Sequence, residues 1–258
     1  YPVLHNLYAR VEAFHGNVYT ANTDGSQLRH PAGSIRLKIG GSVMSGQRGE
    51  IHECLTFLGY EKEDFPPLGS LIAQTREMID KLTPVRNAKP IEDQYVGPVW
   101  IDMPVLLTNS FFDHLKSSRS GINQMQGTAK AENLNKRLFS TDITIKCTPL
   151  LKKYKNTPLL GSFETDIEGV TPKKELILVE KGVVKNLLRS RIPTLTGSQS
   201  TGNSYYSNNP YLLQARLNPG VVEISTSNGM VDADMKKQLI EAALNEGLSH
   251  AYIIRRLP

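Results

Sequence analysis

The sequence predicts an α+β fold built mainly of antiparallel sheets with a few packed helices. Strand-like segments form two blocks, at about 7–58 and 141–189, and helical segments lie between and after them. Short turn signals join neighbouring strand-like segments, which favours hairpins over the long crossovers of a regular parallel array. A chain of 258 residues is long enough for one large domain or two small ones.

The first strand-like block predicts an antiparallel meander with one buried face. We expect strands at 7–14, from 18 onward, at 34–43 and at 50–58, with turns at His15-Gly16-Asn17 and Thr23-Asp24-Gly25-Ser26. In the third strand, apolar and basic side chains alternate, so Ile35, Leu37 and Ile39 lie on one side and Arg36 and Lys38 on the other. Gly40-Gly41 indicates a bulge or bend there.

Two helices are expected after this meander. Pro66-Pro67 precedes a helix at 68–82, and Thr83-Pro84 ends it. The apolar residues of this segment recur at helical spacing: Leu71, Ile72, Met78, Ile79 and Leu82, with Thr75 among them. A strand at 97–102 leads to a second helix at 104–116, and the polar segment 117–126 predicts a flexible loop.

The second block predicts a sheet with a central hairpin. Strands are expected near Ile143 and Ile145, at 161–163, at 175–180 and at 183–189, with Lys181-Gly182 as a two-residue turn. Segment 176–179 is apolar on both faces, which is typical of a central strand. A loop at 196–210, a strand at 221–225, a helix at 231–246 and a strand at 251–255 follow. We therefore divide the chain into an N-terminal part, 1–92, and a C-terminal sheet region, 93–258.

Composition excludes several classes of protein. The chain is 39% apolar and 21% charged, which is ordinary for a globular protein and wrong for a disordered one. Apolar runs are too short to span a membrane. Cys54 and Cys147 allow one disulfide at most, so they build neither a disulfide scaffold nor a Cys-rich zinc module. Because the chain begins at Tyr1 without a Met, we expect that a leader or an upstream domain was removed.

The basic balance by itself is consistent with nucleic-acid binding. The net charge is +5 and the isoelectric point is near 9.1. However, Lys and Arg residues are scattered, and their longest cluster is Lys152-Lys153-Tyr154-Lys155. A solvated surface is the better interpretation, and nucleic acid is not the expected partner.

Residue spacing alone builds no catalytic site. His52-Glu53 could begin a zinc-peptidase motif, but position 56, where a second His would be needed, is Thr56, and the local pattern is that of a strand. The six histidines are dispersed, whereas a catalytic zinc needs three protein ligands. The sequence also lacks a nucleophile elbow and a phosphate loop.

A set of motifs from Gly161 onward is more specific. It comprises Gly161-Ser162-Phe163, Asp166-Ile167-Glu168-Gly169, Val179-Glu180, Gly182-Val183-Val184-Lys185, Leu188, Arg191 and Ser200-Thr201-Gly202-Asn203, with Tyr95-Val96-Gly97-Pro98-Val99 upstream. In this order the motifs resemble the TldD/PmbA family, whose members are described as metallopeptidases and, under an older name, as modulators of DNA gyrase. The resemblance extends from about Tyr8 to the end of the chain.

The resemblance also implies where a zinc site would lie. One subunit of the family carries His-Glu-x-x-x-His on the helix after the Gly-Pro-Val strand. In this sequence Asn109 stands at the first His, Ser110 at the Glu, and His114 at the second His. An amide is a poor zinc ligand, and a serine cannot accept the proton of a metal-bound water. The family's Cys ligand near the C-terminus has no evident counterpart, so His114 is interpreted as a remnant and no cofactor is expected.

For the peptide site, the resemblance implies a paired assembly that takes an unfolded peptide into a groove. We expect the groove residues to be Gly161, Ser162, Phe163, Asp166, Glu168, Gly169, Thr201, Gly202 and Asn203. An extended peptide could add there as one more strand. Asp166 and Glu168 have two open roles: they fix the turn into Gly169, or they meet positive groups of the peptide.

The expected function is therefore that of a non-catalytic, zinc-site-degenerate subunit or domain that binds extended peptide beside an active partner. The partner would be a TldD-like peptidase or a second copy of the chain, and a cytoplasmic location follows from the resemblance. Two alternatives stay open. The first is an active zinc peptidase whose remaining ligands lie outside this chain, and the second is a basic nucleic-acid-binding module.

Overall fold

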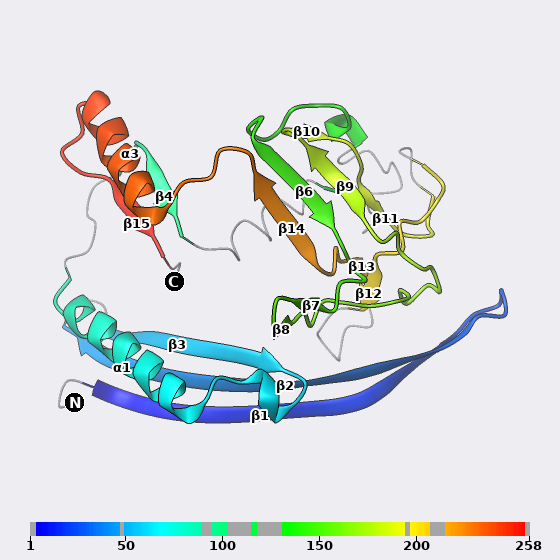
Figure 1. Cartoon of the computed structure of the whole chain (residues 1–258), viewed down its shortest axis with the longest axis horizontal. Helices are drawn as coiled ribbons and strands as arrows, with labels where there is room; N and C mark the ends of the chain where they lie inside the picture. The colour runs from blue at the N-terminus through cyan, green and yellow to red at the C-terminus, as the bar shows by residue number, and fades with distance from the viewer. Residues whose placement is uncertain are drawn as a thin grey trace. The chain divides into compact units, whose positions relative to one another are not determined.

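The structure is a computed structural model that describes residues 4–46, 49–88, 94–102, 115–117, 131–193, 197–206 and 215–255. The chain forms two compact units. Unit 1 comprises residues 1–92 and 152–160, and unit 2 comprises 93–151 and 161–258. The architecture is α+β with mostly antiparallel pairing (Figure 1), which confirms the predicted fold class.

Unit 1 contains a three-stranded antiparallel sheet in the order β1-β2-β3. Its strands are β1 (Leu4–Ala21), β2 (Gln27–Ser45) and β3 (Gly49–Gly59). The predicted turn at His15-Gly16-Asn17 is wrong, because these residues lie inside β1 and pair with residues 31–33 of β2. The second turn signal is where the chain reverses, and Asn22 Oδ1 accepts hydrogen bonds there from the N–H groups of Asp24 and Ser26.

Strand β2 has no bulge or bend at its two adjacent glycines, because its pairing is continuous there. Gly40 and Gly41 pair in register with both neighbouring strands, so the predicted bulge or bend at this pair is wrong. Pro31 lies in β2 beyond the end of β3, where β2 has only β1 as a neighbour. A proline is tolerated in such an edge segment because its missing N–H interrupts fewer ladder bonds.

Helix α1 (Leu68–Val85) covers part of one face of this sheet (Figure 1). Met78, Ile79 and Leu82 are its buried residues, as their helical spacing predicts. The Met78 side chain approaches Gly41, so the helix lies on the face to which Ile35, Leu37 and Ile39 belong. The helix continues through Pro84, one turn further than predicted. Unit 1 also contains a small hairpin, which the sequence did not predict: β7 (Lys153–Tyr154) and β8 (Thr157–Pro158).

Unit 2 contains a four-stranded antiparallel sheet in the order β10-β9-β6-β14. Its strands are β6 (Ile143–Cys147), β9 (Leu176–Glu180), β10 (Val183–Val184) and β14 (Val222–Thr226). β9 lies between two neighbours, and Leu178 and Val179 are fully buried, so β9 is a central strand as predicted, whereas its hairpin partner β10 stands at the end of the strand order. Lys181 and Gly182 form the turn, with φ angles of 48° and 79°. Such positive values are typical of the two-residue turns that match strand twist.

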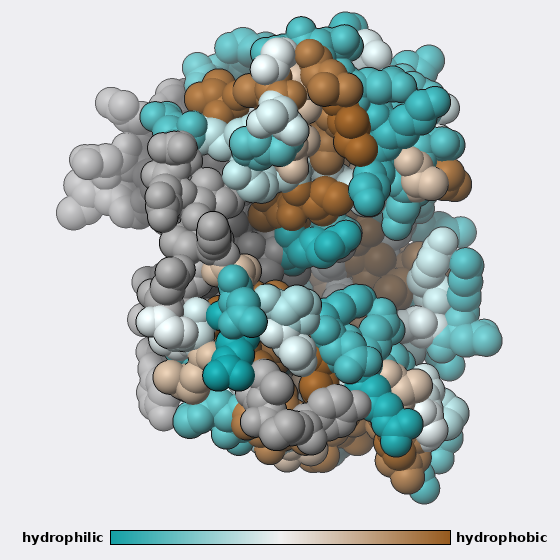
Figure 2. Space-filling view, turned by 90° about the vertical axis from the view of Figure 1, so that its left-hand side faces the viewer, coloured by the Kyte–Doolittle hydropathy of each residue, from teal (hydrophilic) through white to brown (hydrophobic). Residues whose placement is uncertain are grey.

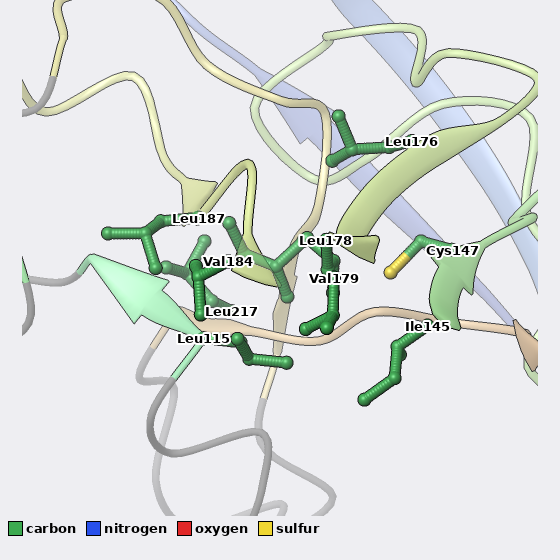
Figure 3. Packing of buried hydrophobic residues seen from close by; sticks show 10 residues of the cluster. Leu115, Ile145, Cys147, Leu176, Leu178, Val179, Val184, Leu187 and Leu217 are labelled. Atoms are coloured by element: carbon green, nitrogen blue, oxygen red, sulfur yellow. The ribbon is translucent and has the colours of Figure 1, made fainter. Parts of the chain in front are cut away.

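The core of unit 2 lies around this hairpin (Figure 3). Buried residues from five strands and the loops beside them make one cluster: Leu115, Ile145, Cys147, Leu176, Leu178, Val179, Val184, Leu187, Leu188 and Leu217. Leu115 precedes β5 (Lys116–Ser117), which pairs in parallel with β11 (Leu188–Arg189). The prediction of a helix at 104–116 is therefore wrong at residues 115 and 116, and its residues 104–114 lie outside the described part.

Three further elements of unit 2 differ from or refine the sequence prediction. Residues 161–163 are a loop and not a strand. The predicted strand at 183–189 is divided into β10 and β11. The predicted loop at 196–210 contains β12 (Ser204–Tyr206), which pairs with β13 (Ala215–Leu217).

The C-terminal segment contains a helix and a parallel strand pair. Helix α3 (Asp232–Asn245) precedes β15 (Tyr252–Ile254), which pairs with β4 (Val99–Ile101). These positions agree with the predicted helix at 231–246 and the strands at 251–255 and 97–102. Short 3₁₀ turns occur at Lys62–Asp64 and Ala131–Asn133.

Apolar side chains reach the surface in both units, and Figure 2 shows them interspersed with polar ones on one face. Among the residues that the structure describes, no helix combines the length and apolar character needed to cross a bilayer. Both cysteines are free: Cys54 is exposed in β3 and Cys147 is buried in β6. The disulfide that two cysteines would allow is therefore not formed.

Candidate functional site

The residues of the predicted groove lie in loops of unit 2 that hydrogen bonds connect. Asp166 is at the centre of this arrangement and is 1% exposed. Its Oδ1 accepts hydrogen bonds from the N–H groups of Glu168 (3.0 Å) and Val170 (2.9 Å). The backbone closes the same turn, since Gly169 N–H donates to the Asp166 carbonyl (3.1 Å). Of the two roles that the sequence left open, the geometry of Asp166 is that of fixing the turn.

A second set of bonds joins this turn to the segment around Ser204. Asp166 Oδ2 accepts from Ser204 N–H (3.0 Å), and the Ser204 carbonyl accepts from Ile167 N–H (3.2 Å). Glu168 Oε2 accepts from the Ser204 hydroxyl and from Arg191 N–H, both at 2.7 Å. Two carboxylates thus hold three chain segments together, and we call Asp166, Glu168 and Ser204 the carboxylate clamp.

Thr201, Gly202 and Asn203 lie next to the clamp and are held by backbone contacts. Thr201 Oγ1 accepts from Arg189 N–H (3.0 Å), and the Arg189 carbonyl accepts from Thr201 N–H (3.0 Å). Asn203 is 1% exposed, and its amide donates to the Asn218 carbonyl (3.3 Å). Gly202 is also buried. The segment that sequence reasoning took for a polar loop is therefore an ordered, largely buried connection.

Gly161, Ser162 and Phe163 lie at the other end of the same network. Phe163 N–H donates to the Pro149 carbonyl (2.8 Å), and the Phe163 ring packs on Gly220. A side chain on Gly161 would lie 2.9 Å from the Gly220 carbonyl oxygen, so this close approach of two backbones requires glycine. Gly161 is exposed and lies beside Gly220, and β14 begins two residues after Gly220. Gly161 therefore borders the start of β14.

Strand β14 is an open edge of the four-stranded sheet. It pairs with β6 alone among the described strands, and residues 223–226 are exposed. The Val221 carbonyl accepts from Thr148 N–H, and Ser227 N–H donates to the Asp142 carbonyl. In this register the odd-numbered residues of β14 are therefore the ones that bond to β6. Because bonded and non-bonded pairs alternate in an antiparallel ladder, Val222, Ile224 and Thr226 direct their backbone N–H and C=O groups away from β6. Sequence reasoning predicted this strand but gave no sign that it was an edge.

The electrostatics of the clamp follow from burial. Burial raises the pKa of Asp166 above its ordinary range, and three backbone N–H donors, from Ser204, Val170 and Glu168, act in the opposite direction. The nearby Glu168 carboxylate raises the pKa of Asp166 further. A buried carboxylate with its oxygens already bonded is suited to hold the loops in place and is not positioned to contact a ligand.

The described residues contain no group of three or more His, Cys, Asp or Glu side chains that could hold a metal ion. Asn109, Ser110 and His114, on which the zinc motif would fall, lie outside the described residues. His52 is in β3, 3.5 Å from Glu50, as expected for a strand histidine outside any zinc motif.

The sequence model of the PmbA/TldA metallopeptidase C-terminal domain matches residues 102–241, which is more than half of the chain. The chain belongs to the PmbA/TldA family. The resemblance drawn from its motifs is thereby confirmed. The match includes the carboxylate clamp, Gly161 and β14. A comparison with curated proteins gives no match.

Solved structures related to this PmbA/TldA chain agree with the fold. A protein from Thermotoga maritima, titled a modulator of a DNA gyrase, is 18% identical, with a TM-score of 0.57 over 83% of this chain and 46% of that chain. A protein from Bacteroides thetaiotaomicron, whose title likewise names DNA gyrase modulation, is 13% identical, with a TM-score of 0.58 over 76% of this chain and 44% of that chain. TldE from Thermococcus kodakarensis is 15% identical, with a TM-score of 0.53 over 88% and 47%. The chain thus spans less than half the length of each of these proteins.

Proposed function

We propose that this chain is a non-catalytic subunit or domain of a peptide-processing pair, which binds extended peptide or unfolded protein beside an active metallopeptidase partner. Membership of the PmbA/TldA metallopeptidase family supports the reaction class. The Asn109 and Ser110 substitutions in the expected zinc motif support the non-catalytic role, because neither side chain replaces the residue it stands for. We propose a cytoplasmic location and no bound metal on the same grounds.

The observation that carries the proposal is the open edge of β14. Outward N–H and C=O groups at Val222, Ile224 and Thr226 can pair with the backbone of an added strand. Ile224 is 42% exposed, so the edge also offers an apolar side chain. Backbone pairing does not depend on the side chains of the ligand, which suits a protein that receives many peptide sequences.

The predicted groove residues contribute to this site in two ways. Gly161, Ser162 and Phe163 border the start of β14, where they would meet one end of the peptide. The carboxylate clamp, with Gly169, Thr201, Gly202 and Asn203, holds the loops that support this border. In the proposal Asp166 is a positioning residue, because its carboxylate is buried and bonded within the chain.

The variant Ile224→Pro tests the proposal. Proline removes an outward N–H that makes no bond to β6, so the existing sheet is expected to remain. We expect binding of a short unstructured fluorescein-labelled peptide, measured by fluorescence anisotropy, to weaken about tenfold or more, since each lost hydrogen bond contributes about 0.5–1.5 kcal/mol and proline also obstructs the edge. Ile224→Thr keeps the N–H and the β-branched shape, and it should bind within about threefold of the wild-type affinity.

Two results would contradict the proposal. One is wild-type affinity in Ile224→Pro, with circular dichroism showing an intact fold. The other is strong discrimination between the peptide and a scrambled peptide of the same composition, because backbone pairing predicts similar affinities for both.

A further inference from the structure

One face of the β14 edge carries an exposed carboxylate (Figure 1). Glu223 lies directly opposite Lys146 of β6, and the side chains of directly paired residues extend on the same face of a sheet. The Lys146 ammonium pairs with Glu175 Oε2 at 3.2 Å, whereas Glu223 has no ion pair with any described residue. The edge therefore presents a glutamate whose neighbouring lysine is paired with another carboxylate.

The other face of the same strand is apolar. Val222 packs on the core of unit 2, and Ile224 lies opposite Ile145, which is 1% exposed. Ile224 itself is 42% exposed at the edge. A strand that adds to β14 would therefore extend an apolar face on one side of the sheet and a charged face on the other.

The hydrogen-bond phase of β14 brings an added strand close to the Glu223 side chain. The backbone groups of Glu223 bond to Lys146, since the odd-numbered residues of β14 bond to β6. In an antiparallel addition, the ligand residue opposite Glu223 therefore occupies a non-bonded pair, where Cα atoms lie about 4.5 Å apart and side chains approach most closely. The charge of this ligand residue then acts directly on the Glu223 carboxylate.

We infer that the peptide site selects a basic residue and that Glu223 is its specificity-determining residue, an inference that rests on the proposed peptide-binding function of β14. The preferred ligand segment is apolar–basic–apolar, with Lys or Arg opposite Glu223 and apolar residues opposite Ile224 and Val222. A ligand can shift by two residues along the edge, so the preference follows the presence of a basic residue more than its position. A scrambled peptide of the same composition then still binds with similar affinity.

Charges alternate across the sheet in this arrangement. Glu175, Lys146 and Glu223 form a row of negative, positive and negative groups, and a ligand lysine continues the alternation. Opposite charges that face each other across strands are favourable, and like charges are unfavourable. Neighbouring strands are about 4.8 Å apart, so the ligand lysine lies about 10 Å from Lys146. Because the Debye length is about 8 Å at physiological ionic strength, this repulsion is screened more than the attraction by Glu223.

Other charges along β14 also favour a cationic ligand. Residues 221–227 contain no Lys or Arg that would repel it and no Pro that would block pairing. Asp142 adds a second carboxylate at the far end of the strand, where its Oδ1 accepts from the Ser227 hydroxyl at 3.0 Å. The net charge of the chain, +5, would by itself favour an acidic ligand, so a preference for lysine would identify the local carboxylates as its cause.

Peptides that differ at a single residue test the preference. Each is an unstructured Ser/Thr/Val peptide of about nine residues with an N-terminal fluorescein and Lys, Gln or Glu at its centre. By fluorescence anisotropy at about 50 mM salt, we expect the wild type to bind the Lys peptide about fivefold more tightly than the Glu peptide, with the Gln peptide between them. The ratio should decrease at about 500 mM salt, because the charges are screened.

Variants at position 223 assign this preference to one side chain. Glu223→Lys should invert the order of the Lys and Glu peptides, and Glu223→Gln should bring their affinities within about twofold of each other. Glu241→Gln is the matched control, because it removes an exposed carboxylate from α3 and changes the net charge equally. This control should keep the wild-type ratio.

The results distinguish failure of the charge preference from failure of the peptide site. Equal affinities for the Lys and Glu peptides, with weakened binding in Ile224→Pro, would overturn the role of Glu223 and leave the β14 site intact. A lysine preference that persists in Glu223→Gln would also overturn that role. Absence of binding of all three peptides, or binding that Ile224→Pro leaves unchanged, would overturn both. Circular dichroism of each variant excludes unfolding as the cause.

Disulfide trapping locates the ligand residue. In a Cys54→Ser background, which removes the exposed native thiol, Glu223→Cys should form a mixed disulfide in glutathione redox buffer with the same peptide carrying Cys at its centre. Cα atoms about 4.5 Å apart are within disulfide range. Glu175→Cys is exposed but separated from the edge by Lys146 and β14, and it should be trapped at least about tenfold less. Equal trapping at both positions would overturn the placement of the ligand.

Discussion

Asp166 shows how one side chain connects the loops of the candidate site. Its two oxygens accept three backbone N–H groups from two chain segments, and its pKa is raised by burial. Sequence reasoning named Asp166 and Glu168 as candidates for peptide binding and left open the alternative that they fix the turn, because Asp-x-Glu-Gly is good turn chemistry. Sequence reasoning could not find Ser204, because its role is visible only in the tertiary structure. The Ser204 hydroxyl bonds to Glu168, 36 residues away in sequence, and the Ser204 N–H bonds to Asp166, 38 residues away.

Substitution of Asp166 should lower the free energy of unfolding, because the Asp166 carboxylate is bonded within the chain. Asp166→Ala leaves three N–H groups without their acceptor, and we expect a loss of about 2–3 kcal/mol in the free energy of unfolding. Asp166→Asn can keep the two bonds of Oδ1 and should lose about 1 kcal/mol. Urea denaturation measures both. Equal, negligible effects of the two variants would contradict the clamp.

The Asp166→Asn variant also reveals the sign of the pKa shift. A carboxyl whose pKa is higher in the folded state binds more protons folded than unfolded, so its contribution to stability decreases as pH rises above the ordinary value near 4. The amide that replaces the carboxyl in Asp166→Asn does not titrate in this range. The stability advantage of the wild type over Asp166→Asn should therefore shrink as pH rises from about 4 to neutral. An advantage that grows over this range would indicate a lowered pKa.

At the scale of elements, the hairpin of β9 and β10 was the most predictable feature. Apolar residues on both faces of 176–179 and the Lys181-Gly182 turn sufficed, because both signals are local. The His15-Gly16-Asn17 turn was wrong for the opposite reason. These three residues are compatible with a turn, but they pair with β2 as part of a long continuous ladder. No local sequence pattern predicts such long-range pairing.

The Lys181-Gly182 turn makes an element-scale prediction. Gly182 has a φ of 79°, and a side chain there would collide with the Phe139 carbonyl, so Gly182→Ala should cost more than about 1 kcal/mol. Lys181→Asn, at a φ of 48°, should stabilise the protein by about 0.5 kcal/mol, because asparagine tolerates this conformation better. Thermal denaturation followed by circular dichroism compares them. A neutral Gly182→Ala would show that the turn relaxes freely.

At the scale of the whole molecule, the proposal that can be tested most directly is the absence of catalysis. The non-catalytic proposal predicts a zinc stoichiometry near zero by elemental analysis after metal loading and desalting, for the wild type and for His114→Ala alike. A ratio near one that is lost in His114→Ala would contradict the proposed register of the zinc motif. The chain should then be assayed as a peptidase.

The sequence by itself determined the α+β class, the family, the hairpin of β9 and β10, α1 and α3, since periodicity, turn chemistry and ordered motifs are properties of neighbouring residues. It also identified the loops of the candidate site. Only the tertiary structure decided which strands are edges, that Asp166 is buried and bonded, and that Gly161 borders β14. The reason is physical: a free N–H or a buried carboxylate depends on which distant segment lies opposite, and long-range pairing leaves little trace in local sequence.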